Sequence, residues 1–179
     1  MRESARRQDV VGHVACRIPV RRGGDCLRVA VDGPDGSGKT TFADELAAAV
    51  RALGRPVVRV SLDDFHHVRA VRYRQGRESP EGFWRDSYDY QRFRDGVLDP
   101  FAPGGTRRYR PLAHDLGTDV TAKRMARRDG TNPDPAHPAM RRYVEAQRIY
   151  FAACSPQQRA DILIDNEDLE TQRIIRTTS

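Results

Sequence analysis

The stretch VAVDGPDGSGKTTFADEL, residues 29–46, joins three patterns that decide the expected fold. An apolar run rich in β-branched residues ends at Asp32, a glycine-rich loop follows, and an amphipathic pattern begins at Thr41. The loop matches the pattern G-x-x-x-x-G-K-[ST] from Gly33 to Thr40. A strand, a loop and a helix are therefore expected in this order.

The flanking residues extend this pattern into a larger unit. Residues 26–32 are typical of a buried strand, and the apolar positions across 40–53 have helical spacing. Gly54 follows where a helix C-cap belongs, and 56–64 is a second apolar run. A strand, helix and strand within such a short length predict a βαβ unit with parallel strands.

The loop contains the residue types that bind phosphate groups. Its glycines permit the backbone torsions that turn N–H groups inward, and a helix N-terminus adds the positive end of its dipole. Lys39 supplies a mobile charge for β- and γ-phosphates, and the hydroxyl of Thr40 is a ligand for Mg²⁺. The predicted nucleotide-binding residues are Gly33, Asp35, Gly36, Ser37, Gly38, Lys39, Thr40 and Thr41.

The remaining chain predicts further elements around this unit. Residues 1–9 have the pattern of a frayed basic lead, and 10–20 fit either a short strand or a packing arm. The other expected elements are a helix near 89–98, a basic helix at 119–129, a loop at 130–138, an amphipathic helix at 139–154 and a strand at 160–166.

Composition favours an anionic partner. The 179 residues have a net charge of +6, which suits nucleotides, phosphorylated metabolites or nucleic acid, although an arginine-rich soluble surface explains it equally well. Cys16, Cys26 and Cys154 show no CxxC spacing, so a reduced, cytoplasmic protein is expected. No membrane span or signal peptide is predicted.

Two acids follow the second apolar run. Asp63 and Asp64 are expected at the sheet edge that carries the loop, because ligands bind outside the carboxyl ends of parallel strands. A carboxylate there can take a proton from an attacking hydroxyl or bind Mg²⁺. The plainer alternative is an Asp that caps a turn.

A series of blocks now carries a family resemblance. VAVDGPDGSGKTTFA, VSLDDFH, DSYDY, RRYRPLAHD, RMARRDG, RRYVEAQRIYF and ADILIDN occur in the order found in the uridine kinase-like branch of P-loop kinases. That branch also contains phosphoribulokinase and a type of pantothenate kinase. The resemblance implies an α/β fold with three α/β/α layers and a mainly parallel sheet. It also implies a kinase that uses ATP and Mg²⁺ to phosphorylate a hydroxyl of a nucleoside or similar metabolite.

The resemblance also assigns roles to individual residues. Asp63 corresponds to the general base, with Lys39, Arg124 and Arg128 as further catalytic residues and Thr40 and Asp64 as metal ligands. The residues implied to face the substrate are Asp86, Tyr109, His114 and Gln147, and Arg127 completes the arginine cluster of a lid at 119–138. The plainer alternatives are a helix N-cap for Asp86, ordinary packing for Tyr109, a surface histidine for His114, a solvated helix face for the arginines, and a core or surface position for Gln147.

One segment of the family pattern is missing. The chain passes from the His114 block directly to the basic helix, without the β-α-β stretch whose acid helps to organise Mg²⁺. Only three strong strands are predicted, at 27–32, 56–63 and 160–165, with no buried strand ending in an acid between 66 and 158. A sheet with fewer strands, low thermal stability and weak or absent kinase activity are therefore expected. The gap could be closed by direct pairing, by the N-terminal segment, or by dimerisation.

This gap leaves alternative functions open. A nucleotide-binding protein without efficient catalysis is the main alternative, and an NTPase associated with nucleic acid is less favoured because no RNA- or DNA-binding module is visible. The expected organisation is an arm at 1–25, a kinase-like domain at 26–168 and a tail at 169–179.

Overall fold

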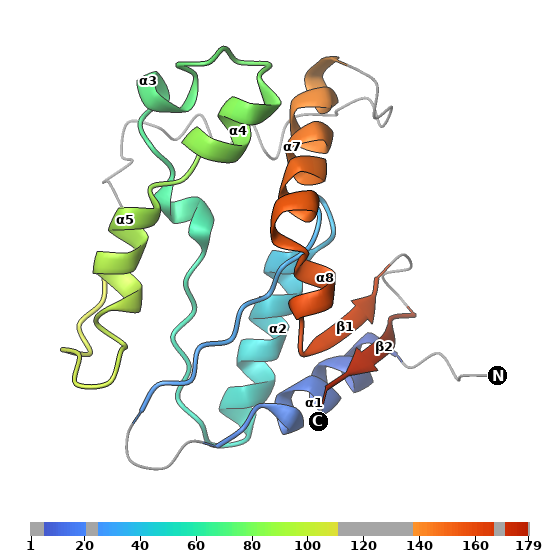
Figure 1. Ribbon diagram of the computed structural model, residues 1–179. Helices are drawn as coiled ribbons and strands as arrows, with labels where there is room; N and C mark the ends of the chain where they lie inside the picture. The colour runs from blue at the N-terminus through green and yellow to red at the C-terminus, as the bar shows by residue number, and fades with distance from the viewer. Residues whose placement is uncertain (1–5, 21–24, 111–137, 167–170, 179) are drawn as a thin grey trace. The chain divides into compact units, whose positions relative to one another are not determined.

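The computed structural model describes residues 6–20, 25–110, 138–166 and 171–178, without the side chains of 138–140 (Figure 1). Contacts divide the chain into a first unit, Met1–Arg59 with Cys154–Ser179, and a second unit, Val60–Ala153. In chain order the elements are α1 (Arg7–Arg17), α2 (Lys39–Ala52), the 3-10 helix η1 (Leu62–Phe65), α3 (Arg69–Arg72), α4 (Pro80–Asp86), α5 (Tyr90–Phe93), the π-helical turn η2 (Arg94–Leu98), α7 (Pro138–Cys154), α8 (Pro156–Arg159), β1 (Ile162–Asp165) and β2 (Arg173–Thr177).

The predicted helix after the glycine-rich loop is confirmed as α2. Its end has the geometry of a Schellman motif, in which the N–H of Gly54 bonds to Arg51 O at 2.9 Å and the N–H of Arg55 bonds to Val50 O at 3.4 Å. Gly54 has a φ of 74°, a left-handed torsion that glycine adopts without the steric cost of a side chain. Local sequence therefore determines both the start and the end of this helix.

The N-terminal segment forms a helix, α1, which packs against α2. The buried residues of α1 contribute one stripe of the core, and Arg7 Nε forms an ion pair with Glu45 Oε2 of α2 at 2.7 Å. The alternative of a short strand at 10–20 is thereby corrected, because the apolar spacing also fits a helix face. The core of the first unit consists of Val10, Val11, Val14, Ala15, Phe42, Leu46 and Val50.

The C-terminal residues form the sheet that the structure describes. β1 pairs antiparallel with β2, with Asp165 opposite Arg173, and an ion pair of 3.0 Å joins these two side chains. Ile164 and Ile174, also opposite each other, pack against the core of the first unit. The predicted strand at 160–166 is therefore present. Both α1, within the predicted arm at 1–25, and β2, within the predicted tail at 169–179, belong to this unit.

The two runs predicted as parallel strands, 26–32 and 56–64, are not strands in the structure. Residues 25–33 and 55–61 have no assigned secondary structure, and 62–65 form η1. A strand requires a neighbouring ladder, and the sheet formed by the described residues contains only β1 and β2. Val29 and Val58 in these runs are 51% and 48% exposed. The parallel sheet of the three-layer fold stays a prediction.

The second unit has a core of aromatic side chains. Phe65 of η1 is fully buried and meets Phe93 edge to face, with 5.2 Å between the ring centroids. The helix predicted near 89–98 is present as α5, which continues into η2. The helix predicted at 139–154 is confirmed as α7, whereas the predicted basic helix at 119–129 lies outside the described residues.

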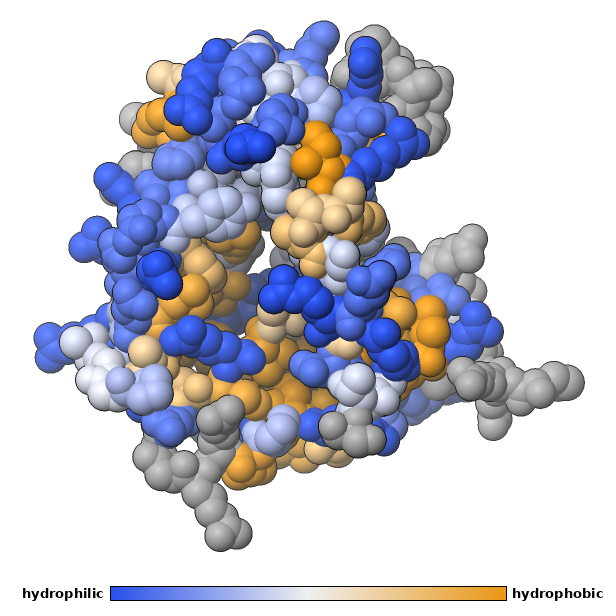
Figure 2. Space-filling model, viewed as in Figure 1, coloured by the Kyte–Doolittle hydropathy of each residue, from blue (hydrophilic) through white to orange (hydrophobic). Residues whose placement is uncertain are grey.

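The surface combines charged and apolar side chains. Figure 2 shows hydrophilic residues in blue interrupted by orange apolar residues on the viewed face. None of the helices within the described ranges has the length and apolar character needed to cross a membrane.

Candidate functional site

The glycine-rich loop has the backbone torsions that its sequence predicts. Gly36 and Gly38 have φ values of 78° and 76°, which lie in the left-handed region. Between them, the N–H of Ser37 bonds back to Pro34 O at 3.2 Å and closes a tight turn. Successive torsions of this kind curve the backbone into the concave form that binds anions.

The helix that follows the loop presents an uncompensated positive end. Gly38 is the N-cap of α2 and has no side chain that could accept a bond from the first N–H groups. The first turn of α2, which the structure describes in full, contains no acidic residue, and Thr40 and Thr41 are exposed. An anion at this position would satisfy the free N–H groups and interact favourably with the helix dipole.

The side chain of Lys39 bends back to the first residues of the loop. Its Nζ donates to Gly33 O at 2.8 Å and to Pro34 O at 2.7 Å, and lies 3.8 Å from Asp35 Oδ1. The ammonium group is therefore held beside the loop. A phosphate there would replace neutral carbonyl contacts with charge-assisted bonds, which are stronger.

Two amide side chains next to β1 and β2 anchor the glycine-rich loop. Asn166 Nδ2, just after β1, donates to Ser37 O at 2.5 Å, and Asn166 Oδ1 accepts from Gln172 Nε2. Gln172 is fully buried. Sequence reasoning missed both residues, and the position of Asn166 at the end of a predicted strand was the available signal.

Asp63 lies in the second unit, on η1. Its N–H donates to Ser61 Oγ at 3.3 Å, so Ser61 is the residue that caps this turn. Its exposed carboxylate accepts from the Tyr88 hydroxyl at 3.1 Å. The ring of Tyr88 lies 4.5 Å from that of His66, whose Nδ1 is 2.7 Å from Asp63 O. Asp63, His66 and Tyr88 therefore form one polar cluster, and sequence reasoning missed the role of the latter two.

The electrostatic environment of His66 keeps its imidazole neutral. Burial lowers the pKa of His66 below its ordinary value of 6.5. The hydrogen bond to Asp63 and the charges of Asp63 and Asp64 oppose this shift, whereas the charge of Arg72 adds to it. A neutral imidazole can accept a proton, so the cluster contains a second potential base beside the carboxylate.

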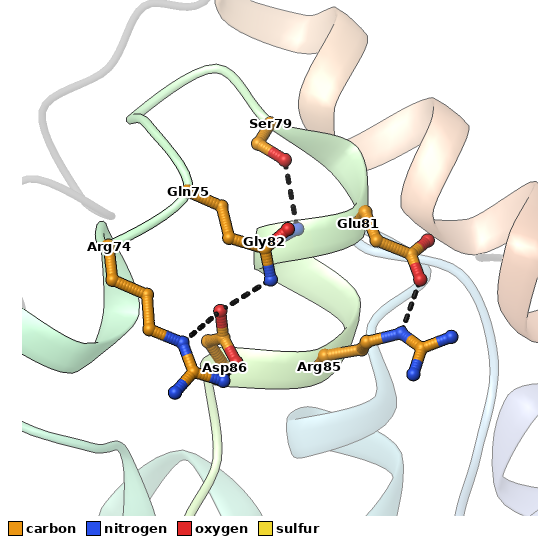
Figure 3. Close-up of polar contacts among 7 residues, drawn as sticks. All are labelled: Arg74, Gln75, Ser79, Glu81, Gly82, Arg85 and Asp86. Atoms are coloured by element: carbon orange, nitrogen blue, oxygen red, sulfur yellow. Dashed lines mark hydrogen bonds and ion pairs between the residues drawn. The ribbon is translucent and has the colours of Figure 1, made fainter.

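Asp86, predicted to hold substrate hydroxyls, binds neighbouring side chains instead (Figure 3). It is 2% exposed, and it accepts from Arg74 Nε at 3.0 Å and from Gln75 Nε2 at 2.7 Å. The hydrogen bond from Arg74 is the main cause that lowers the pKa of this carboxylate. Asp86 ends α4, so it is not the helix N-cap of the alternative interpretation; Ser79 caps this helix by accepting from the N–H of Gly82 at 3.0 Å.

The other predicted substrate residues are only partly described. Tyr109 is 39% exposed and its ring lies 5.5 Å from that of Phe101, so it makes the packing contact of the plainer alternative. Gln147 is half-buried on α7. The remaining predicted residues, His114, Arg124, Arg127 and Arg128, lie outside the described residues.

The predicted metal ligands are Thr40 and Asp64. Within the ranges that the structure describes, no three His, Cys, Asp or Glu side chains are grouped to hold a metal. Thr40 and Asp64, the predicted Mg²⁺ ligands, belong to different units. Within the first unit, the Thr40 hydroxyl is the predicted protein ligand for a magnesium ion at the loop, and nucleotide phosphates and water would supply further oxygens.

No family model matches this chain, and no curated protein or solved structure matches it either. The resemblance to uridine kinase-like proteins rests on the sequence blocks, and the function drawn from it is therefore a proposal.

Proposed function

We propose that this protein is a P-loop kinase that binds Mg·ATP at Gly33–Thr41 and phosphorylates a hydroxyl of a small metabolite. The observation that carries the proposal is the loop itself. Left-handed torsions at Gly36 and Gly38, an N-terminal helix turn without an acid, and the ammonium of Lys39 converge on one concave backbone. Each of these features favours a bound phosphate chain.

The chain's own residues supply positioning and charge. The loop N–H groups orient the phosphates, and Lys39 neutralises charge on the β- and γ-oxygens. Bound ATP supplies the transferable phosphoryl group. Asp63 accepts the proton of the acceptor hydroxyl as the oxygen attacks phosphorus and the bond to the ADP oxygen breaks, while Tyr88 orients the carboxylate.

The test compares two variants with matched controls in the full chain. Lys39→Ala should weaken ATP binding by about tenfold or more, because it removes a charge-assisted contact to phosphate. Arg51→Ala removes a positive charge from the far end of the same helix and should leave binding unchanged. Equal ATP affinity of Lys39→Ala and the unmodified chain, measured by calorimetry, would refute the phosphate assignment.

The catalytic role is tested separately from binding. Asp63→Asn should reduce ADP formation in the presence of a productive acceptor by about 10²-fold while ATP affinity is retained. Asp95→Asn is the control, since Asp95 is also an exposed carboxylate of the second unit and accepts from Gln91 Nε2 at 2.8 Å. The acceptor panel contains nucleosides, pantothenate and sugar phosphates.

A nucleotide-binding protein without efficient transfer is the second candidate. It is favoured because 25–33, before the loop, and 55–61, before Asp63, are not strands, so the described residues do not form the parallel-sheet edge that was expected to carry both. ATP binding that depends on Lys39, without ADP formation for any acceptor, would select this candidate.

A further inference from the structure

Four arginines surround one tyrosine ring in the second unit. The guanidinium carbons of Arg69, Arg72, Arg77 and Arg142 lie 6.0, 5.5, 5.5 and 5.3 Å from the centroid of Tyr73. We call these five residues the Tyr73 cluster. Each distance is within the range of a cation–π contact, but a ring has only two faces, so the arrangement brings like charges together.

Arg142 is fixed in this cluster by three aromatic rings. Besides Tyr73, its guanidinium lies 4.9 Å from the centroid of Phe83 and 5.0 Å from that of Tyr143. Its Nη1 donates to Arg77 O at 2.6 Å, whereas its buried Nε has no acceptor within the described part of the chain. The side chain is thus pre-organised and keeps donor capacity.

The loop that carries Tyr73 and Arg77 is also anchored to Asp86 of α4, through Arg74 and Gln75 (Figure 3). Arg74 and Gln75 both converge on this buried carboxylate, at 2.5 Å for Arg74 Nη2 and 2.7 Å for Gln75 Nε2. Asp86 is paired with Arg74, so its charge does not offset the positive charge of the Tyr73 cluster. Arg85 is likewise neutralised by Glu81 on α4.

The cluster, in contrast, has an excess of positive charge. Among the described residues, Arg69, Arg77 and Arg142 have no carboxylate within ion-pair distance, although Arg74 and Arg85 nearby both have one. Guanidinium groups gathered around one ring repel one another, and an anion bound beside the ring by two or more of them would reduce that repulsion. The planar fork of arginine matches the oxygens of phosphate by bidentate hydrogen bonds.

We propose that the Tyr73 cluster is a second anion site, which binds the phosphate group of a small molecule. The cluster shares no residue with the glycine-rich loop, which belongs to the first unit, whereas the cluster belongs to the second. The four guanidiniums gather around one ring, a compact arrangement that suits a single phosphate, whereas a nucleic-acid backbone requires a longer track of charges.

The experiment uses the full chain with Lys39→Ala, so that binding at the phosphate loop is weakened. Inorganic phosphate, ribose 5-phosphate and ribose are titrated by calorimetry, which distinguishes a free phosphate from a phosphate ester. Arg77→Gln and Arg142→Gln, each added to Lys39→Ala, should weaken phosphate binding by about tenfold, the loss expected for a hydrogen bond to a charged group. Arg85→Gln is the matched control and should bind as well as Lys39→Ala alone.

The outcomes separate this site from the proposed kinase function. Phosphate or ribose 5-phosphate binding that survives Lys39→Ala and falls with Arg77→Gln supports the cluster, whatever the fate of ATP binding. Arg77 is exposed, so its substitution is compatible with folding, which circular dichroism checks. The proposal is overturned if binding is equal in Arg77→Gln, Arg142→Gln and Arg85→Gln, if Lys39→Ala abolishes all phosphate binding, or if only RNA binds and its affinity depends on these arginines.

Discussion

At the scale of single residues, the phosphate loop is held by the side chain of Asn166. This amide donates to Ser37 O and accepts from the buried Gln172. The bond orients the Ser37 peptide, whose neighbours Gly36 and Gly38 have left-handed torsions. Asn166 is therefore a positioning residue for the loop and touches no phosphate itself.

Replacing this amide should weaken nucleotide binding without removing a phosphate contact. In Asn166→Asp the donor becomes a carboxylate oxygen that faces Ser37 O, and a lost or repulsive buried contact costs about 1–3 kcal/mol. We expect ATP affinity to fall by about fivefold or more, with far-UV circular dichroism unchanged. Gln158→Glu on α8 makes the same amide-to-acid change at an exposed position and is the control. Unchanged affinity in Asn166→Asp would show that the loop holds its form without this bond.

His66 predicts how stability changes with pH. Because burial lowers its pKa below 6.5, the unfolded chain binds a proton at a higher pH than the folded chain. The contribution of neutral His66 to the free energy of unfolding is fully present above about pH 6.5, and it is lost as the pH falls through 6.5 toward the folded pKa. Urea unfolding between pH 7.5 and pH 5 should show this loss, and His66→Gln should reduce it.

At the scale of elements, α2 connects the loop to the core of the first unit. Its N-terminus forms one side of the candidate site, and its buried stripe packs against α1 and against apolar residues of β1 and β2. The Schellman motif at Gly54 fixes where the helix ends. The position of the loop therefore depends on the packing of α2.

Two leucines of this helix provide a direct test. Leu46 is 5% exposed in the core, and Leu46→Ala should lower the free energy of unfolding by about 2–5 kcal/mol. Leu53, at the C-cap, is 52% exposed, so Leu53→Ala should change it by only about 0.5 kcal/mol. Chemical denaturation measures both. Similar losses for the two variants would contradict the described packing of α2.

At the scale of the whole molecule, two described segments with apolar, strand-forming sequence, 26–32 and 56–61, do not pair in the sheet. Val29 and Val58 remain about half exposed in runs whose sequence is typical of buried strands. Such exposure lowers the apolar area buried on folding, and domains are stable by only about 5–15 kcal/mol in total.

We therefore expect low thermal stability and slow phosphoryl transfer for this chain. Calorimetry should give a broad transition or a midpoint below about 45 °C, the lower limit for typical mesophilic domains. ATP at 100 times its dissociation constant should add about 2.7 kcal/mol if it binds only the folded state. A cooperative transition above about 65 °C together with robust acceptor-dependent turnover would contradict this expectation.

The sequence by itself determined the elements whose causes are local. The torsions at Gly36 and Gly38, the helical spacing of α2 and its end at Gly54 follow from residues close together in the chain. The amphipathic pattern of α7 is equally local. A helix forms its hydrogen bonds within one segment, so its pattern and caps are sufficient to predict it.

Tertiary structure decided the features that need a distant partner. The apolar residues at 10–20 are compatible with more than one kind of element, and their packing against α2 selects the helix. Strand pairing depends on the neighbouring ladder, which is why 173–177 formed a strand and 26–32 did not. The contact of Asn166 with Ser37 joins residues 129 positions apart. Asp86, which was expected to face the substrate, forms an ion pair with Arg74. Sequence spacing cannot show such contacts, because burial and side-chain direction arise only when the elements pack.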